Sequence, residues 1–160
     1  MAVILENIHK TFNMGSINEN HVLRGLNLIL EKGDFVTVIG GNGSGKSTLL
    51  NVIADTVKPE EGEVSIDGTV LTKMSVKKRA KYIGRVFQDP RMGSATQLSI
   101  EENLAIASKR GNVRGFAKGV SQKDKGYFIE RLKTLDLGLE NRLKAEMGLL
   151  SGGQRQAITL

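Results

Sequence analysis

The chain has 160 residues, of which 39% are hydrophobic and 25% charged, and its net charge is +6. This length predicts one domain, and a sequence without cysteine excludes a disulfide framework and a cysteine-based zinc site. No stretch approaches the roughly 18 consecutive apolar residues of a membrane span, and residues 1–6 lack the basic leader and the length of a signal peptide.

Strand patterns dominate the first part of the chain. Residues 2–8 and 22–30 predict strands, and residues 26–30 begin with the alternation of a half-buried one. A turn at residues 31–34 leads into a third run, residues 34–39, which is apolar and β-branched. Such a run is typical of a strand buried on both faces, so we expect residues 34–39 to form a buried strand.

A glycine-rich loop connects this run to an amphipathic helix. Its fixed positions are Gly40, Gly45, Lys46 and Ser47, the pattern of a phosphate-binding loop, or P-loop. Glycines allow close approach of a ligand, and the N–H groups of the loop and helix start attract phosphate oxygens. Lys46 supplies a positive charge for the β- and γ-phosphates, and Ser47 offers a hydroxyl to Mg²⁺. The predicted phosphate site comprises Gly41, Asn42, Gly43, Ser44, Gly45, Lys46, Ser47 and Thr48.

The next segment continues the β-rich part of the chain as far as Gln88. Residues 63–66 and 69–70, joined by an Asp-Gly pair, predict a hairpin. Residues 75–81 predict a short basic helix, and residues 83–87 a further buried strand that ends at Gln88.

Helical patterns follow Gln88. Ser99 and Glu102 form a capping box that opens one helix, and a second helix begins near Ser121. The order of elements predicts a mixed α/β protein. Residues 1–88 would form a β-rich core, residues 89–150 approximately a helical subdomain, and residues 151–160 the start of a further helix.

The positive charge is concentrated between residues 108 and 126, where six basic residues accompany one acidic residue. Three interpretations remain open: a solvated basic surface, a patch that faces a membrane or partner, and a nucleic-acid site. A single aromatic residue in this segment, Phe116, argues against nucleic acid. The charged residues are Lys109, Arg110, Arg114, Lys118, Lys123, Lys125 and Asp124.

A second glycine segment, Leu-Ser-Gly-Gly-Gln at residues 150–154, precedes a predicted helix start. Ser151 is a favourable N-cap residue, and the N–H groups behind Gly152 and Gly153 form an anion site at a helix N-terminus. Alone, this segment fits either a capped helix or a second phosphate site.

Together, the two glycine segments resemble the ATP-binding subunits of ABC transporters, and the resemblance covers essentially the whole chain. Residues 150–154 match the family's signature motif residue for residue, and residues 40–47 match its P-loop. Gln88 stands where the family has its Q-loop glutamine, and Phe12 where it has an aromatic residue that stacks on adenine. The resemblance implies an α/β fold: a P-loop NTPase core with an antiparallel β subdomain and an inserted helical subdomain.

The resemblance also implies a mechanism in which two subunits meet head to tail and enclose two ATP molecules. Each ATP would lie on the Lys46 loop of one subunit, with Mg²⁺ near Ser47 and Gln88, and Lys46 and Gln88 would be the catalytic residues. The other subunit would cap the ATP with Ser151, Gly153 and Gln154. Phe12 would stack on adenine; its alternative is an ordinary edge-strand phenylalanine.

The implied partners are a second copy of the subunit, separate transmembrane permease subunits and a solute-binding protein, at the cytoplasmic face of the membrane. Residues 92–105 and 148–150 resemble amino-acid-type importers, and lipoprotein-type exporters share much of the pattern. Other open functions are an ATPase that acts on DNA or ribosomes and a nucleotide-binding module without hydrolysis. The 105 positions from Lys46 to Ser151 contain no heptads or cysteines, which favours transport.

The family next places an apolar strand that ends in Asp-Glu, followed later by a histidine, and neither occurs in these 160 residues. We therefore expect the C-terminal part of the core to be missing here, and the full subunit to be the ATPase. By itself, this stretch should hydrolyse ATP inefficiently.

Overall fold

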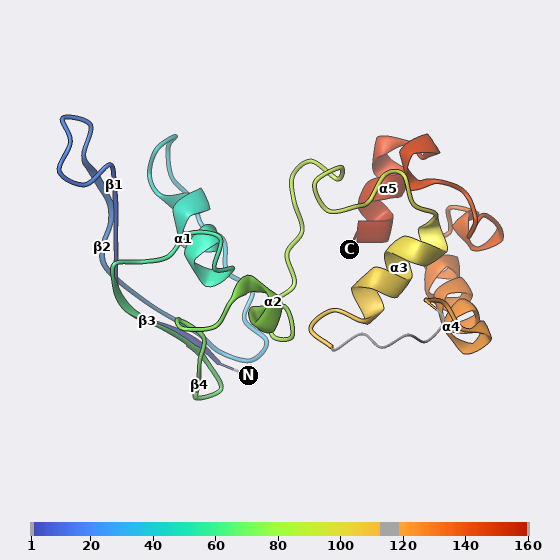
Figure 1. Cartoon of the computed structure of the whole chain (residues 1–160), viewed down its shortest axis with the longest axis horizontal. Helices are drawn as coiled ribbons and strands as arrows, with labels where there is room; N and C mark the ends of the chain where they lie inside the picture. Colours follow the sequence, from blue (N-terminus) through green and yellow to red (C-terminus); the bar gives the residue numbers. More distant parts are fainter. Residues whose placement is uncertain (1, 113–118, 160) are drawn as a thin grey trace. The chain divides into compact units, whose positions relative to one another are not determined.

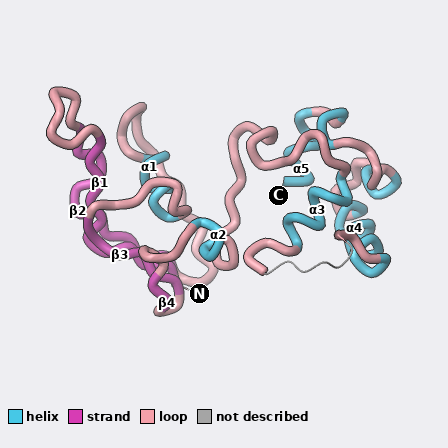
Figure 2. Tube along the Cα trace, in the orientation of Figure 1, coloured by secondary structure: helices cyan, strands magenta, loops and turns pink. Residues whose placement is uncertain are grey.

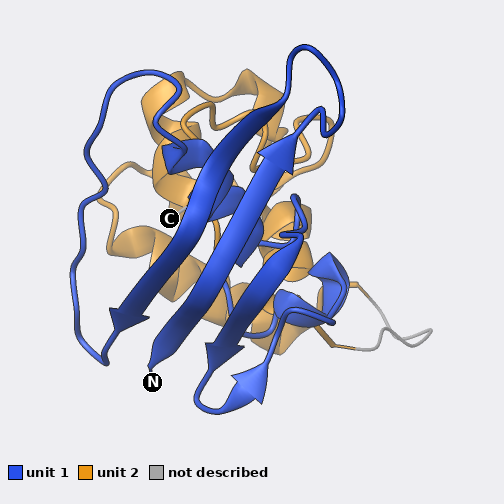
Figure 3. Cartoon of the chain, turned by 90° about the vertical axis from the view of Figure 1, so that its left-hand side faces the viewer, with its two compact units in different colours: residues 1–83 blue, residues 84–160 orange. Residues whose placement is uncertain are grey.

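The computed structural model describes residues 2–112 and 119–159, and the chain forms two compact units, residues 1–83 and 84–160 (Figure 3). All strands of the described residues lie in the first unit, and most of the helices lie in the second (Figure 2). The predicted division of one domain near residue 88 stays a prediction.

Arg114, Phe116 and Lys118 of the basic segment lie outside the described residues. No helix in the described part of the chain combines the length and apolarity needed to cross a membrane.

The first unit contains an antiparallel sheet with the strand order β2-β1-β3-β4 (Figure 1). β1 (Val3–Phe12) pairs with both β2 (Asn20–Leu30) and β3 (Glu61–Ile66), and β4 (Thr69–Val70) extends the sheet beyond β3. The strands predicted at residues 2–8 and 22–30 and the hairpin predicted at residues 63–66 and 69–70 are confirmed, with longer bounds for β1, β2 and β3. Asp67 and Gly68 between β3 and β4 have φ angles of 48° and 74°, the pair of positive values that a type I′ hairpin turn requires.

One hydrophobic core joins this sheet to α1 (Lys46–Ile53), the helix that follows the glycine loop. Alternate residues of the strands and the apolar stripe of α1 supply its buried side chains. The core therefore fixes the helix that carries the predicted phosphate site against the sheet. Its buried members are Leu5, Ile8, Leu23, Leu49, Val52, Val64, Ile66 and Leu71.

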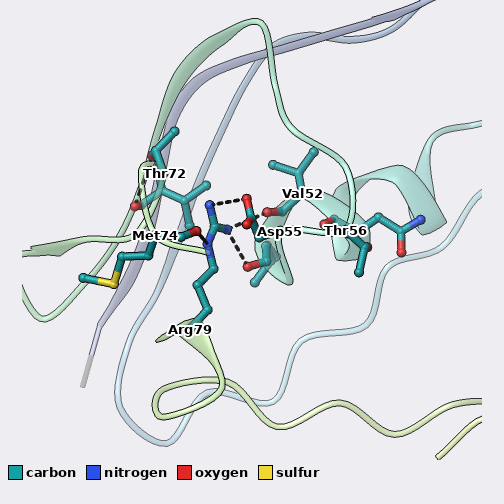
Figure 4. A network of polar contacts seen from close by, with 9 residues as sticks. Val52, Asp55, Thr56, Thr72, Met74 and Arg79 are labelled. Carbon is teal, nitrogen blue, oxygen red and sulfur yellow. Dashed lines mark hydrogen bonds and ion pairs between the residues drawn. The ribbon is translucent and has the colours of Figure 1, made fainter. Parts of the chain in front are cut away.

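A buried ion pair closes the C-terminal end of α1 (Figure 4). The Arg79 side chain is 1% exposed, and its Nη2 lies 3.0 Å from Oδ1 of Asp55. Nη1 donates to the carbonyls of Val52 and Ile53 at 2.9 Å each, and Nε donates to the carbonyl of Met74 at 3.3 Å. Burial lowers the pKa of Arg79, and the Asp55 carboxylate opposes that shift. The guanidinium thus binds the carbonyls that a helix end leaves without intrahelical partners.

Arg79 ends α2 (Val76–Arg79), the short helix expected at residues 75–81. Its two preceding residues, Lys77 and Lys78, are exposed, whereas the arginine points into the first unit. The predicted helix is confirmed with shorter bounds.

The two apolar runs expected as buried strands, residues 34–39 and 83–87, are irregular in the structure, so these predictions were wrong. Phe35 and Ile39 are 95% and 88% exposed, and Val86 is 47% exposed. A strand buried on both faces needs neighbouring strands to satisfy its N–H and C=O groups. Neither run has a ladder partner among the described residues, so the apolar pattern alone does not produce a strand.

The second unit is built from α3 (Ile100–Ser108), α4 (Gln122–Lys133), two 3₁₀ turns, η1 (Leu139–Asn141) and η2 (Met147–Leu149), and α5 (Gly152–Thr159). The predicted capping box at Ser99 and Glu102 is confirmed. Ser121 and Asp124 form a second one at the start of α4. The buried core of this unit consists of Ile100, Leu132, Leu139, Met147 and Leu150.

Replacing Asp55 with asparagine should lower the free energy of unfolding by about 3 kcal/mol, because it leaves the Arg79 charge buried without a counter-ion. Asparagine tolerates the positive φ of 63° at this position, so the change isolates the charge. The matched control is Asp136→Asn, an exposed aspartate with φ 52°, which should change stability by less than about 0.5 kcal/mol. Urea unfolding measures both, and equal effects would contradict the role given to the ion pair.

Acidification should weaken the start of α3. The Ser99 hydroxyl and backbone N–H donate to Glu102 and hold the pKa of Glu102 below its ordinary value of 4.5. The box therefore stabilises the fold above that value and loses its contribution as the pH falls through the lowered pKa. Between about pH 6 and about pH 3, the free energy of unfolding of the Glu102→Gln variant should fall less than that of the unchanged chain. The exposed Glu130→Gln should behave like the unchanged chain in the same unfolding series.

Candidate nucleotide-binding site

The glycine loop folds so that at least two of its glycines are required. Gly43 and Gly45 have φ angles of 81° and 89°, in the left-handed region that disfavours other residues. A Cβ atom on Gly45 would lie 2.9 Å from Cγ1 of Val22 in β2, and one on Gly40 would lie 2.5 Å from Oγ of Ser44. The loop thus packs closely on itself and on β2 before α1 begins.

The Lys46 amine lies inside this loop. Nζ donates to the carbonyl oxygens of Gly40 and Gly41 at 2.8 and 2.7 Å. A third contact, 3.5 Å to Oγ of Ser44, is at the limit of a hydrogen bond. An ammonium group has three donors, so one remains available to an anion that enters the loop. The loop and the first turn of α1 therefore fit a phosphate group.

The hydroxyls that follow Lys46 fit the remaining part of the predicted site. Ser47 is exposed and Thr48 is half-buried, and neither hydroxyl has a hydrogen-bond partner within the described residues. Those residues also contain no cluster of three or more His, Asp or Glu side chains that could hold a metal ion. Magnesium characteristically combines few protein ligands with phosphate oxygens and waters. Ser47 thus fits Mg²⁺ that arrives with a polyphosphate.

Phe12 lies at the end of β1 that is nearest to the glycine loop. Its neighbour Lys10 pairs in the β1–β2 ladder with Leu23, and Cδ2 of Leu23 lies 3.3 Å from a Cβ placed on Gly45. Phe12 follows two residues later, about 7 Å along the strand. Its side chain is 36% exposed, with the Lys10 amine 5.3 Å from the ring centroid. The position suits stacking on a base beside the loop, and the contact stays a prediction.

The signature segment forms the start of α5. The Ser151 Oγ accepts from the Gln154 N–H, and the Gln154 Oε1 accepts from the Ser151 N–H, each at 3.2 Å. This reciprocal pair is a capping box, which confirms the predicted N-cap. Apart from the chain neighbours and the backbone of α5 itself, no described atom lies within 4 Å of a Cβ placed on Gly152 or Gly153, and neither has a positive φ. Nothing in the described residues therefore requires glycine at these two positions.

Gln88 lies in an exposed bend of the second unit, after an irregular segment in place of the expected strand. The Arg85 guanidinium stacks on the ring of Phe87 immediately before it, 4.7 Å from the centroid. The structure thus groups the P-loop residues in the first unit and the signature residues in the second. The predicted contact of Gln88 with Mg²⁺ stays a prediction.

Two buried arginines, Arg79 and Arg155, were not predicted from the sequence. Arg155, in the second turn of α5, is 7% exposed. A basic side chain near a helix N-terminus opposes the helix dipole, which is a signal that could have identified it. Arg79 follows two lysines, and such a basic run is usually solvated, so no local signal distinguishes it.

A known protein family matches most of the chain. The family model described as ABC transporter matches residues 23–160. The chain belongs to the ABC transporter family. It is 35% identical over 156 residues to a tyrosine transport ATP-binding protein of Clostridioides difficile (strain R20291), covering 98% of this chain and 62% of that protein. An energy-coupling factor transporter ATP-binding protein of Mycoplasmopsis synoviae (strain 53) is 32% identical, over 94% of this chain and 53% of that protein.

A solved structure resembles this ABC transporter family member along its length. It is a dimeric, post-hydrolysis state of an ATP-binding cassette bound to ADP and Pi, with a TM-score of 0.77 and 35% identity. The match covers 98% of this chain and 67% of the solved chain. The α/β cassette fold that the sequence predicted is thereby confirmed. The chain spans between about half and two thirds of the length of these relatives.

Alanine at two glycines should have opposite effects on stability. Gly45→Ala should lower the free energy of unfolding by about 1–2 kcal/mol, because of its positive φ and the contact with Val22. Gly153→Ala should raise it by up to about 1 kcal/mol, because the helix accepts alanine without a clash. Urea unfolding of the two variants tests this assignment. Destabilisation by Gly153→Ala would show that the fold itself needs this glycine.

Proposed function

We propose that this chain is the nucleotide-binding part of a subunit that binds and hydrolyses ATP to drive a membrane ABC transporter. The observation that carries the proposal is the Lys46 amine held inside a left-handed glycine loop at the start of α1. A helix N-terminus, a cradle of N–H groups and a fixed cation bind the phosphates of a nucleotide. The ADP-bound and Pi-bound state of the similar cassette supports ATP as the ligand.

In this proposal the first unit binds ATP. Residues 41–45 present N–H groups to the phosphates, Lys46 donates to the β- and γ-phosphates, and Thr48 donates to a further phosphate oxygen. Ser47 and Gln88 would hold Mg²⁺, which would supply positive charge to the transferring phosphoryl group. Phe12 supports the adenine. Lys46 and Gln88 are the proposed catalytic residues because they would contact the reacting phosphate and water.

The signature segment acts on ATP bound to a second copy of the chain. Two consecutive glycines in the first turn of a helix weaken it, and nothing in the described residues requires them. Because no described side chain covers these glycines, a phosphate could come within contact distance of Ser151, Gly153 and Gln154. Dimeric similar cassettes support this trans arrangement. ATP would then stabilise the dimer by binding both copies.

The proposed transporter takes up a small solute such as an amino acid. The similarity to a tyrosine transport protein supports this cargo class, while the energy-coupling factor relative shows that related subunits serve other systems. Permease subunits would recognise the solute, with a solute-binding protein as a further partner. The subunit would lie peripherally at the cytoplasmic face of the membrane.

Lys46→Ala should raise the dissociation constant for ATP about tenfold or more, because it removes a charged hydrogen bond to the phosphates. Adenosine, which has no phosphates, should bind both proteins equally weakly. Fluorescence titration with a labelled nucleotide measures these affinities. The exposed Lys32→Ala in the same unit should bind ATP normally.

In cells, the full-length protein with Lys46→Ala should lose uptake of labelled tyrosine or of the related amino acid that the unchanged transporter carries. Normal ATP affinity in the variant would refute the P-loop assignment. Normal ATP-dependent uptake would refute the proposed coupling to transport.

A further inference from the structure

Arg155 holds the backbone that leads into the signature segment. Its Nε donates to the carbonyl of Met147 at 3.1 Å, and its Nη2 donates to the carbonyls of Gly148 and Leu150 at 3.1 and 3.2 Å. These acceptors belong to η2 and to the residue before Ser151. One buried side chain therefore fixes three carbonyls within four residues of the N-cap of α5.

The opposite side of the same backbone is also fixed. The N–H groups of Met147 and Gly148 donate to the carbonyls of Leu98 and Thr96, at 2.9 and 2.8 Å. A Cβ on Gly148 would lie 3.0 Å from that Thr96 oxygen, so the two segments are in close contact. The backbone that leads into Ser151 is thus held by two sets of hydrogen bonds, one with the loop before α3 and one with Arg155.

The charge of Arg155 has no counter-ion in the part of the chain that the structure describes. Among the described residues, no carboxylate lies within ion-pair distance of its guanidinium. The guanidinium instead lies near the N-terminus of α5, where the helix dipole is also positive. A cation held only by carbonyl groups there adds to the positive potential over Ser151 and Gly153, which favours an anion.

We propose that Arg155 is a positioning residue for the ATP that the second subunit holds. It does not contact the nucleotide; it fixes the N-cap geometry of Ser151 and the exposed N–H groups at Gly152 and Gly153, and its charge favours the phosphate that they cap. The inference rests on the proposed trans dimer. It predicts that Arg155 acts on ATP-driven dimerisation while leaving ATP binding by the first unit of a single subunit unchanged.

The experiment compares Arg155→Met, Arg155→Lys and the exposed Arg142→Met in the full-length protein with a non-hydrolysable ATP analogue. Light scattering measures dimerisation, nucleotide fluorescence measures affinity in dilute monomer, and urea unfolding measures stability. Arg155→Met should weaken dimerisation about tenfold or more, with monomer affinity within about twofold of the unchanged protein. Arg155→Lys keeps the charge but cannot bind the three carbonyls in the geometry of the guanidinium. Its dimerisation should therefore be intermediate between that of Arg155→Met and that of the unchanged protein. Arg142→Met should match the unchanged protein.

Each outcome is decisive. If the unchanged protein forms no ATP-dependent dimer, the proposed trans capping fails and this inference fails with it. If the unchanged protein dimerises and Arg155→Met dimerises equally well, the proposed function stands and the role of Arg155 is refuted. Parallel loss of monomer affinity and dimerisation would indicate a merely structural role. Should Arg155→Met fail to fold, the folded Arg155→Lys variant decides by the same two measurements.

Discussion

The guanidinium of Arg79 connects the C-terminal end of α1, the helix that begins in the phosphate loop, to the chain that follows the sheet (Figure 4). α1 has only eight residues, so its two ends are not independent. The hydrophobic core fixes one face of the helix, and Arg79 fixes its C-terminus through the carbonyls of Val52 and Ile53. A positive charge at this end also complements the helix dipole. The helix that follows the Lys46 loop is therefore held along its apolar face and at its C-terminus.

Arg155 also binds backbone carbonyls from a buried position, but it differs from Arg79 in its counter-ion. Both arginines donate to consecutive backbone carbonyls at or near a helix end, where a planar fork of five donors is better suited than the point charge of lysine. Arg79 lies at a helix C-terminus and has Asp55 as its counter-ion. Arg155 lies near a helix N-terminus and is bound by carbonyls alone among the described residues. The first charge is compensated by a carboxylate, whereas the second has no carboxylate partner among the residues that the structure describes.

Local signals in the sequence predicted the elements whose causes are local. The capping box of Ser99 and Glu102, the turn at Asp67 and Gly68, and the glycine loop before Lys46 each depend on residues within a few positions of one another. Residues 34–39 and 83–87 were predicted wrongly because a strand requires a partner, which a local apolar pattern cannot supply. Arg79 could not be predicted for a similar reason: the Val52 and Ile53 carbonyls that it binds lie more than 20 positions away, in α1.

The glycines of the two motifs differ in whether the fold itself requires them. Gly45 has a left-handed φ and touches β2, so the chain's own packing explains it. Gly152 and Gly153 have neither constraint, and they weaken the helix that they begin. The two glycines lower the stability of the helix, and nothing inside the described chain requires them, which is consistent with a ligand that approaches them closely. The reciprocal hydrogen bonds of Ser151 and Gln154 stabilise the helix start in spite of these glycines. The signature segment is thus a helix N-terminus with a reciprocal cap and with Arg155 bound to the carbonyls before it, and its glycines leave room for the phosphate of the proposed function.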